Sequence, residues 1–276
     1  MANRLGKAKK TRGKSPYTHK HKGYTPSIIE NITEQADIIL EVLDSRFIEK
    51  TRNREIENKV KKLGKTIIYV FNKLDLVNVS KIKQNIELQE LKPSIFFSAR
   101  DRKGSSELRK LIKIEASKLN EKSINIGVIG YPNTGKSSII NILSGKSAAR
   151  TSSEAGYTKG IQKIKLSKGL YLIDTPGIIP HKEKIGDSKE YHLRHVQIGA
   201  ITWDKTKNPD MVVSRLTKEY PRVLEKHYKI DAKGDSELLI EELGRKLNYL
   251  KKGNLIDEDR VSKKILKDWQ EGKIRI

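Results

Sequence analysis

A phosphate-binding motif in the middle of the chain constrains the fold more than any other feature of the sequence. Residues 130–137 fit the pattern G-x-x-x-x-G-K followed by Ser or Thr. The apolar run before the motif predicts a buried strand, and the apolar face after it predicts a helix that ends near Gly145. In that context glycine backbone, a helix N-terminus and Lys136 bind phosphate oxygens. A nucleotide-binding domain usually starts with this loop, so its central position indicates an unusual order of elements.

The excess of basic residues indicates a polyanionic partner. Lys and Arg total 57 against 34 Asp and Glu, which gives a net charge of +23 and suits RNA, DNA or an acidic membrane surface. The 276 residues can bury a sizeable core, and the lack of cysteine excludes disulfides and thiolate metal sites. We find no apolar run of the ~18 residues that a membrane span needs and no secretory signal. We therefore expect a cytoplasmic protein with no stable membrane association.

Residues 1–24 predict a basic, flexible arm. The segment is poor in apolar residues, and no acidic residue occurs before Glu30. Such a segment can bind phosphodiester backbones and become ordered on contact. A solubilising tail and a transit peptide are the alternative interpretations, and the charge of the whole chain favours RNA contact.

Residues 25–189 predict a doubly wound α/β domain. Thr25-Pro26 is expected to open a helix that runs through about Glu34. Further helices are expected around Val60 and Leu108. Apolar runs predict the strands 38–43, 66–71, 94–97, 124–129, 161–166 and 170–173. The last two flank a turn and form a hairpin, whereas strands that alternate with helices favour a mostly parallel sheet.

Residues 190–276 predict a smaller all-α domain without strands. One helix is expected near Met211 to His227. The last helix starts at Asp257 and stops at Gly272, with early acids and late lysines that suit the helix dipole. Between them, one helix is predicted from leucines at helical spacing, namely Leu239, Leu243, Leu247 and Leu250. The lysines of the last two helices are candidates for contact with ribosomal RNA.

Two motifs before the phosphate loop predict recognition of guanine. Asn72, Lys73 and Asp75 follow one predicted strand, where a carboxylate can accept hydrogen bonds from both N1–H and N2–H₂ of guanine. Adenine cannot satisfy that carboxylate. Ser98 and Ala99 follow another strand, and the Ala99 N–H is predicted to face guanine O6. Each motif alone is also compatible with a plain turn, because Asn and Asp are common turn residues.

The remaining motifs predict a magnesium-bound triphosphate. Asp174 would lie near Mg²⁺ through water, with the Gly177 N–H near the γ-phosphate. Ser137 should bind Mg²⁺ directly, and Thr158 is the expected second protein ligand, with Thr151 as its rival. The predicted nucleotide-binding residues are Asn72, Lys73, Asp75, Ser98, Ala99, Asn133, Thr134, Gly135, Lys136, Ser137, Ser138, Thr158, Asp174 and Gly177. Because each motif ends its own predicted strand, all should face one crevice at the carboxyl edge of the sheet.

The order of these motifs indicates circular permutation. Base-reading motifs precede the phosphate-binding ones, the reverse of a Ras-like domain, and permutation keeps the sheet while it moves the termini. At these residues the chain resembles the circularly permuted GTPases of the YlqF/RbgA and YawG type. Asp44-Ser45-Arg46 is similar to the family's Asp-Ala-Arg motif, with Ile48 near the place of its usual proline, and residues 267–274 look like the family's helical domain. The resemblance implies GTP or GDP with Mg²⁺ as ligands and a role in assembly of the large ribosomal subunit.

Hydrolysis is expected to be slow without help from a partner. Ile178 stands where Ras-like enzymes have a glutamine that orients water. Asn133 matches the phosphate-loop asparagine of K⁺-stimulated GTPases, which makes K⁺ a further candidate cofactor. The resemblance also implies a catalytic histidine from the N-terminal segment. His21 is the candidate, beside Lys136, with His19 close behind it and a solvated histidine as the other interpretation.

The leading hypothesis is a monomeric GTP-hydrolysing switch that binds ribosomal RNA and the large-subunit precursor, is stimulated by ribosomal particles and promotes assembly. The γ-phosphate sensor at residues 174–177 runs almost directly into the helical domain, so we expect GTP to reposition the helices. An RNA-binding assembly scaffold with a vestigial nucleotide site is the alternative, and the intact Lys136 and Asp75 argue against it. A GTPase that acts on tRNA modification or on membranes is the third possibility.

Overall fold

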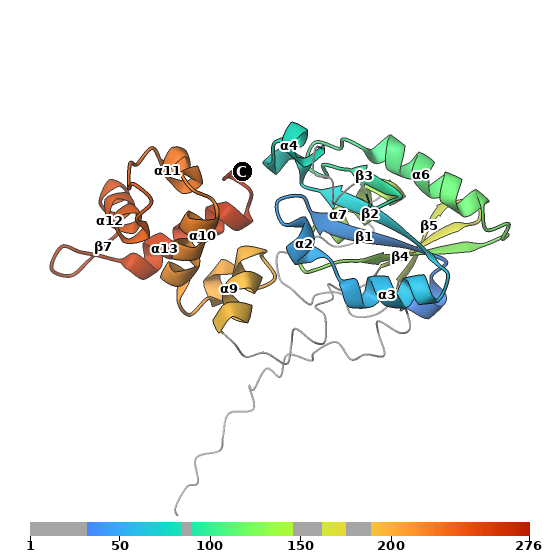
Figure 1. Ribbon diagram of the computed structural model, residues 1–276, viewed down its shortest axis with the longest axis horizontal. Coiled ribbons are helices and arrows are strands. Elements are labelled where there is room, and N and C mark those ends of the chain that lie inside the picture. The colour runs from blue at the N-terminus through green and yellow to red at the C-terminus, as the bar shows by residue number, and fades with distance from the viewer. Residues whose placement is uncertain (1–31, 84–89, 146–161, 175–188) are drawn as a thin grey trace, which may run out of the picture.

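A computed structural model describes residues 32–83, 90–145, 162–174 and 189–276 of the chain. Figure 1 shows two layered bodies, a sheet flanked by helices and a cluster of helices beside it. We call residues 32–174 the α/β part and residues 189–276 the helical part. None of the helices in these described ranges is long and apolar enough to cross a membrane.

A six-stranded sheet forms the centre of the α/β part, in the order β3-β2-β1-β4-β6-β5. The strands are β1 (Ile38–Asp44), β2 (Thr66–Asn72), β3 (Ser94–Phe96), β4 (Ile124–Ile129), β5 (Gln162–Ser167) and β6 (Leu170–Asp174). Neighbouring strands are parallel except for the β5–β6 hairpin. The first strand of the chain thus lies in the middle of the sheet, next to the strand that leads into the phosphate loop. This arrangement confirms the permuted Ras-like fold.

Alternate side chains of the strands pack against helices on the two faces of the sheet. On one face Leu40 and Val42 join a core with residues of α6 (Ser105–Ser117) and α7 (Lys136–Ser144). On the other face Ile39 and Leu43 join a core with residues of α3 (Arg54–Lys62). Shorter helices are α2 (Ile48–Thr51), η1 (Leu74–Leu76) and α4 (Val79–Lys83), and residues 32–35 are the described end of the predicted first helix. Strands buried on both faces explain the nearly continuous apolar runs in the sequence.

The helical part contains helices and one short hairpin. Its elements are α9 (Lys189–Gln197), η2 (Trp203–Lys205), α10 (Pro209–Glu219), α11 (Val223–Tyr228), α12 (Ser236–Lys246), β7 (Leu250–Lys251), β8 (Leu255–Ile256) and α13 (Glu258–Gln270). Two sequence-based expectations were wrong in detail. The helix expected from 211 to 227 is broken at Pro221, which cannot continue the hydrogen-bond ladder, and Arg222 is left-handed. The helix expected to include Leu250 ends at Lys246, and Leu250 begins the hairpin.

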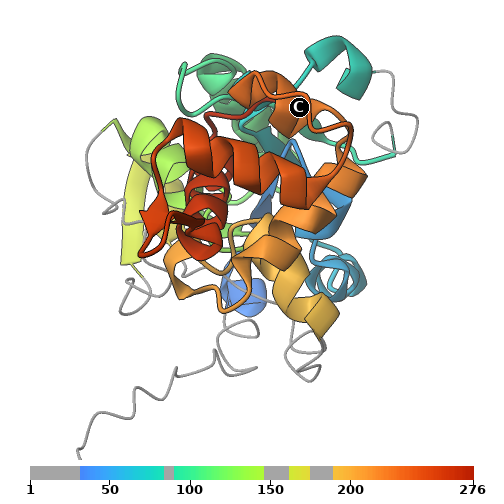
Figure 2. The same ribbon diagram turned by 90° about the vertical axis from the view of Figure 1, so that its left-hand side faces the viewer.

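Side chains of the α/β part enter the core of the helical part. Phe47 and Tyr131 are buried in the same apolar cluster as Leu216 and Trp269. The Phe47 ring lies 5.8 Å from that of Trp269, centroid to centroid. At the chain's end the backbone N–H of Ile276 donates to the Leu76 carbonyl at 3.1 Å. In Figure 2 the helical part faces the viewer, with the α/β part behind it. The two parts therefore share an interface close to the phosphate loop.

Candidate functional site

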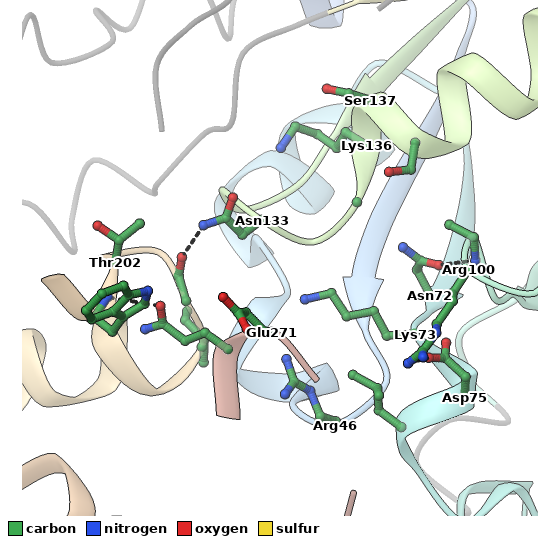
Figure 3. A pocket seen from close by; sticks show the side chains of 18 of the residues that line it. Arg46, Asn72, Lys73, Asp75, Arg100, Asn133, Lys136, Ser137, Thr202 and Glu271 are labelled. Carbon is green, nitrogen blue, oxygen red and sulfur yellow. Dashed lines mark hydrogen bonds and ion pairs between the residues drawn. The ribbon is translucent and has the colours of Figure 1, made fainter. Parts of the chain in front are cut away.

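A cavity of about 610 Å³ lies at the carboxyl edge of the sheet, between the α/β part and the helical part. This volume is within the range of small-molecule sites in proteins. Its walls come from the phosphate loop, from both base-reading motifs and from α13 (Figure 3). Of the predicted residues, the cavity is lined by Asn72, Lys73, Asp75, Ala99, Asn133, Gly135, Lys136, Ser137 and Ser138. Motifs far apart in the sequence thus face one cavity.

The phosphate loop is compact and tied to its own backbone. The Lys136 ammonium donates to the Tyr131 carbonyl at 2.8 Å, and the Thr134 hydroxyl donates to the same oxygen at 3.0 Å. Gly135 has φ +100°, and a Cβ there would lie 2.2 Å from Nδ2 of Asn72. Only glycine allows this approach. The N-terminus of α7 and Lys136 therefore supply positive potential at one end of the cavity.

Asn72 joins the phosphate loop to the second base-reading motif. Its amide nitrogen donates to the Thr134 carbonyl at 2.8 Å, and its oxygen accepts from the Ala99 N–H at 3.1 Å. The Asn72 side chain and its contact with Thr134 are buried, whereas its contact with Ala99 is half-buried at the cavity wall. The Ala99 N–H, which we predicted to face guanine O6, is directed at Asn72 instead. The reason is that Asn72, at the end of a neighbouring strand, brings a strong acceptor to that amide.

Ser98 fixes the carboxylate of Asp75. Its hydroxyl donates to Oδ1 of Asp75 at 2.8 Å. The Arg100 guanidinium lies 4.0 Å from Oδ2 of the same carboxylate. Asp75 lines the cavity (Figure 3), and Ser98 is buried. Ser98 is thus a positioning group for the predicted base-reading carboxylate.

A buried ion network forms part of the cavity wall. Arg46 donates to both oxygens of Asp44, from Nε at 3.1 Å and from Nη2 at 2.8 Å, and Nζ of Lys73 lies 2.8 Å from Oδ2. Burial raises the pKa of Asp44, but Arg46 and Lys73 outweigh it and hold that pKa well below its usual range. Burial lowers the pKa of Lys73, against the opposing effect of Asp44. Lys73 lines the cavity while its ammonium pairs with Asp44.

The helical part supplies a wall of the cavity that sequence reasoning missed. The lining residues from this part include Gly199, Thr202, Trp203, Lys267, Gln270 and Glu271. Asn133 reaches this wall, because its amide nitrogen donates to the Gly199 carbonyl at 2.7 Å (Figure 3). The one signal for this wall in the sequence is the resemblance of residues 267–274 to the family's helical domain. That resemblance does not indicate that these residues line the nucleotide cavity.

Several predicted site residues lie outside the described part of the structure. His19, His21, Thr151, Thr158, Gly177 and Ile178 fall there, and so does most of the predicted sensor at 174–177. Asp174 ends β6 opposite Gln162, but its side chain is not described. Among the described side chains, no three His, Asp or Glu residues form a group that could hold a metal ion. Ser137, the predicted direct ligand of Mg²⁺, lines the cavity.

Comparison with known proteins finds similarity to GTP-binding proteins. Residues 125–232 match the profile of a family described as "50S ribosome-binding GTPase". A GTP-binding protein of Methanocaldococcus jannaschii, itself uncharacterised, is 39% identical over 251 residues, which cover 90% of this chain and 65% of that protein. Nucleolar GTP-binding protein 2 of Saccharomyces cerevisiae is 37% identical over 251 residues, which cover 88% of this chain and 50% of that protein. The chain thus spans between half and two thirds of these relatives.

Solved structures agree on the fold. GNP-bound YlqF from T. maritima superimposes with a TM-score of 0.64 at 23% identity, over 90% of this chain and 93% of that one. GDP-bound YlqF has the same TM-score and identity. The superposition includes most of the described α/β and helical parts and supports the permuted order of the strands.

Proposed function

We propose that this chain carries a circularly permuted domain of the GTPase family, that it binds GTP and GDP, and that it hydrolyses GTP to GDP and phosphate. The observation that carries the proposal is the shared cavity. Asp75 at one side and Lys136 at another line the same space, and Asn72 hydrogen-bonds between their motifs. A guanine base at Asp75 and phosphates at Lys136 would occupy it together.

Selectivity for guanine would come from the Asp75 carboxylate. Ser98 holds one of its oxygens, which fixes the orientation of the group. A rigid carboxylate that faces N1–H and N2–H₂ loses both partners when adenine replaces guanine, and an unpaired buried charge is costly. Ser98 and Asn72 serve this proposal as positioning residues.

The ions follow from the same site. Ser137, Thr158 and the water-mediated Asp174 are the proposed protein contacts of Mg²⁺, which would neutralise charge on the phosphates. Asn133 is the proposed contact of K⁺. For hydrolysis we propose His21 as the group that orients water and Lys136 as the cation that stabilises charge on the transferred phosphate, because Ile178 cannot hydrogen-bond to water.

The proposed partners are ribosomal RNA and the precursor of the large ribosomal subunit. The net charge of +23 and the family described as ribosome-binding favour this partner. We propose that the monomeric protein docks through the arm at 1–24 and the helical part, in the cytoplasm, and that ribosomal particles stimulate its turnover. The alternative, an RNA-binding scaffold with a vestigial site, predicts RNA binding without nucleotide turnover.

Binding of fluorescent mant-GTP and mant-ATP tests the first step. We expect tight binding of mant-GTP alone, and loss of this preference in Asp75→Asn, because the amide offers a donor where guanine also has donors. Asp101→Asn, just after the Ser98–Ala99 motif, is the matched control and should keep the preference for mant-GTP. Turnover with and without large ribosomal subunits tests the second step. Equal binding of both nucleotides would refute the guanine site, and turnover that ribosomal particles leave unchanged would refute the proposed stimulation.

A further inference from the structure

The side chain of Gln270, the last residue of α13, fixes the turn that connects α9 to η2. Its amide nitrogen donates to the Val196 carbonyl at 2.7 Å and to the Ile201 carbonyl at 3.0 Å. Its oxygen accepts from the backbone N–H of Trp203 at 3.0 Å. Both donors and the acceptor of this amide are therefore used to hold residues 196–203 in one conformation. We call this segment the Gly199 turn.

The Gly199 turn is hydrogen-bonded to the phosphate loop. Gly199 has φ +77°, a conformation that favours glycine, and its carbonyl accepts from the amide nitrogen of Asn133 at 2.7 Å. Because a carbonyl can only accept, the nitrogen of the Asn133 amide must face Gly199. The amide oxygen is then turned away from Gly199, on the side of Lys136 (Figure 3). The helical part thus decides which way a polar group of the phosphate loop points.

The direction of that oxygen matters for the chemistry of the site. An amide oxygen cannot donate to phosphate oxygens, since both are acceptors. On the phosphate side of the cavity it can bind a cation or accept from an ordered water. Its placement therefore affects how negative charge is balanced beside the phosphates.

We propose that Gln270 is a positioning residue for GTP turnover and acts through the Gly199 turn on the orientation of Asn133. The inference rests on the proposed function, because it concerns the same nucleotide site. It gives the helical part a route to the phosphate loop that runs through described side chains. A partner that shifts α13 would be sensed at Asn133.

Docking of the two parts does not depend on this route. Nη1 of Arg46 donates to the Trp269 carbonyl at 2.7 Å, and Phe47 packs on the Trp269 ring. Lys50 pairs with Glu219 at 2.6 Å. These contacts hold the helical part in place when the Gln270 amide is changed. A substitution at Gln270 should therefore alter the Gly199 turn and leave the interface between the two parts intact.

Gln270→Glu is the sharpest perturbation, because it keeps the shape and the oxygen that accepts from Trp203. It replaces the donating nitrogen by an oxygen that faces two carbonyls, so the turn must move. We expect kcat/KM for GTP to fall about five- to tenfold, the scale of one lost hydrogen bond. Asn133→Ala should give a similar loss. The double variant should be no worse than Asn133→Ala alone, because both changes act on one group.

Asp268→Asn is the matched control in the same helix. It weakens contacts with the Tyr228 hydroxyl, with Lys264 and with Lys273, none of which reaches Asn133. We expect a change in melting temperature without a change in kcat/KM. Additive losses in the double variant would overturn the inference, and so would unchanged kinetics in Gln270→Glu. The dissociation rate of mant-GDP from the same variants should show the same non-additive pattern. This measurement tests the role of Gln270 even if the wild-type protein does not turn over GTP and the proposed function fails.

Discussion

Removal of the Arg46 side chain should destabilise the protein strongly. The Arg46 side chain is buried and makes two hydrogen bonds to Asp44 and one to the Trp269 carbonyl. Arg46→Ala leaves the buried Asp44 carboxylate with Lys73 as its remaining cation in the network. Breaking a buried ion pair costs about 3–5 kcal/mol, and the lost contact to Trp269 adds about 1 kcal/mol. Because Lys73 remains, we expect about 3–4 kcal/mol in total.

Urea unfolding at neutral pH, followed by tryptophan fluorescence, measures this loss. Arg245→Ala is the control, because its pair with Glu241 is exposed and should contribute less than about 1 kcal/mol. In the background of Asp44→Asn the Arg46→Ala change should cost much less, since no buried carboxylate then needs a cation. A loss below about 1 kcal/mol in the single variant would refute the reasoning.

The pH dependence provides a second check of the same network. The folded pKa of Asp44 lies below its ordinary value of 3.8, so its stabilising effect is present above pH 3.8 and is lost as the pH falls below that value. The difference between wild type and Arg46→Ala should therefore narrow in that acidic range. A difference that stays constant would mean that Arg46 acts through packing alone.

Three other perturbations test separate features. Burial and the nearby Glu57 raise the pKa of Glu41, so the free energy of unfolding should fall as the pH rises above 4.5. Glu41→Gln should remove this pH dependence and raise the melting temperature at pH 7. An unchanged pH dependence in the variant would contradict this role of Glu41. Asn72→Ala removes the partner of the buried Thr134 carbonyl and of the half-buried Ala99 N–H. It should weaken mant-GDP binding about tenfold, which unchanged titration curves would disprove. Gly135→Ala should abolish mant-GDP binding, because the new Cβ would clash with Asn72. Gly145 is also left-handed but has open space around it, so Gly145→Ala should cost only about 1–2 kcal/mol of stability. Equal mant-GDP binding by the two variants would count against the close approach of Gly135 to Asn72.

The sequence alone determined the sheet, the permuted order and the motifs at the strand ends. Each of these rests on local patterns, since a buried strand reads as an apolar run and a phosphate loop reads as fixed glycines before a helix. Leucine spacing does not mark the end of α12, because it continues past Lys246 to Leu250. The break at Pro221 does have a local signal in the sequence, since proline ends a helix.

Only the tertiary structure decided how the motifs are connected. Asn72 was predicted to bind nucleotide, and the fold shows that its amide also joins Thr134 to Ala99. No pattern in the sequence places Gln270 and the Gly199 turn at the site, because hydrogen bonds to backbone carbonyls do not depend on which residues carry those carbonyls. Such contacts join segments far apart in the chain, and no periodicity records them. The phosphate loop could therefore be located from its own residues, whereas the groups that orient it had to be found in space.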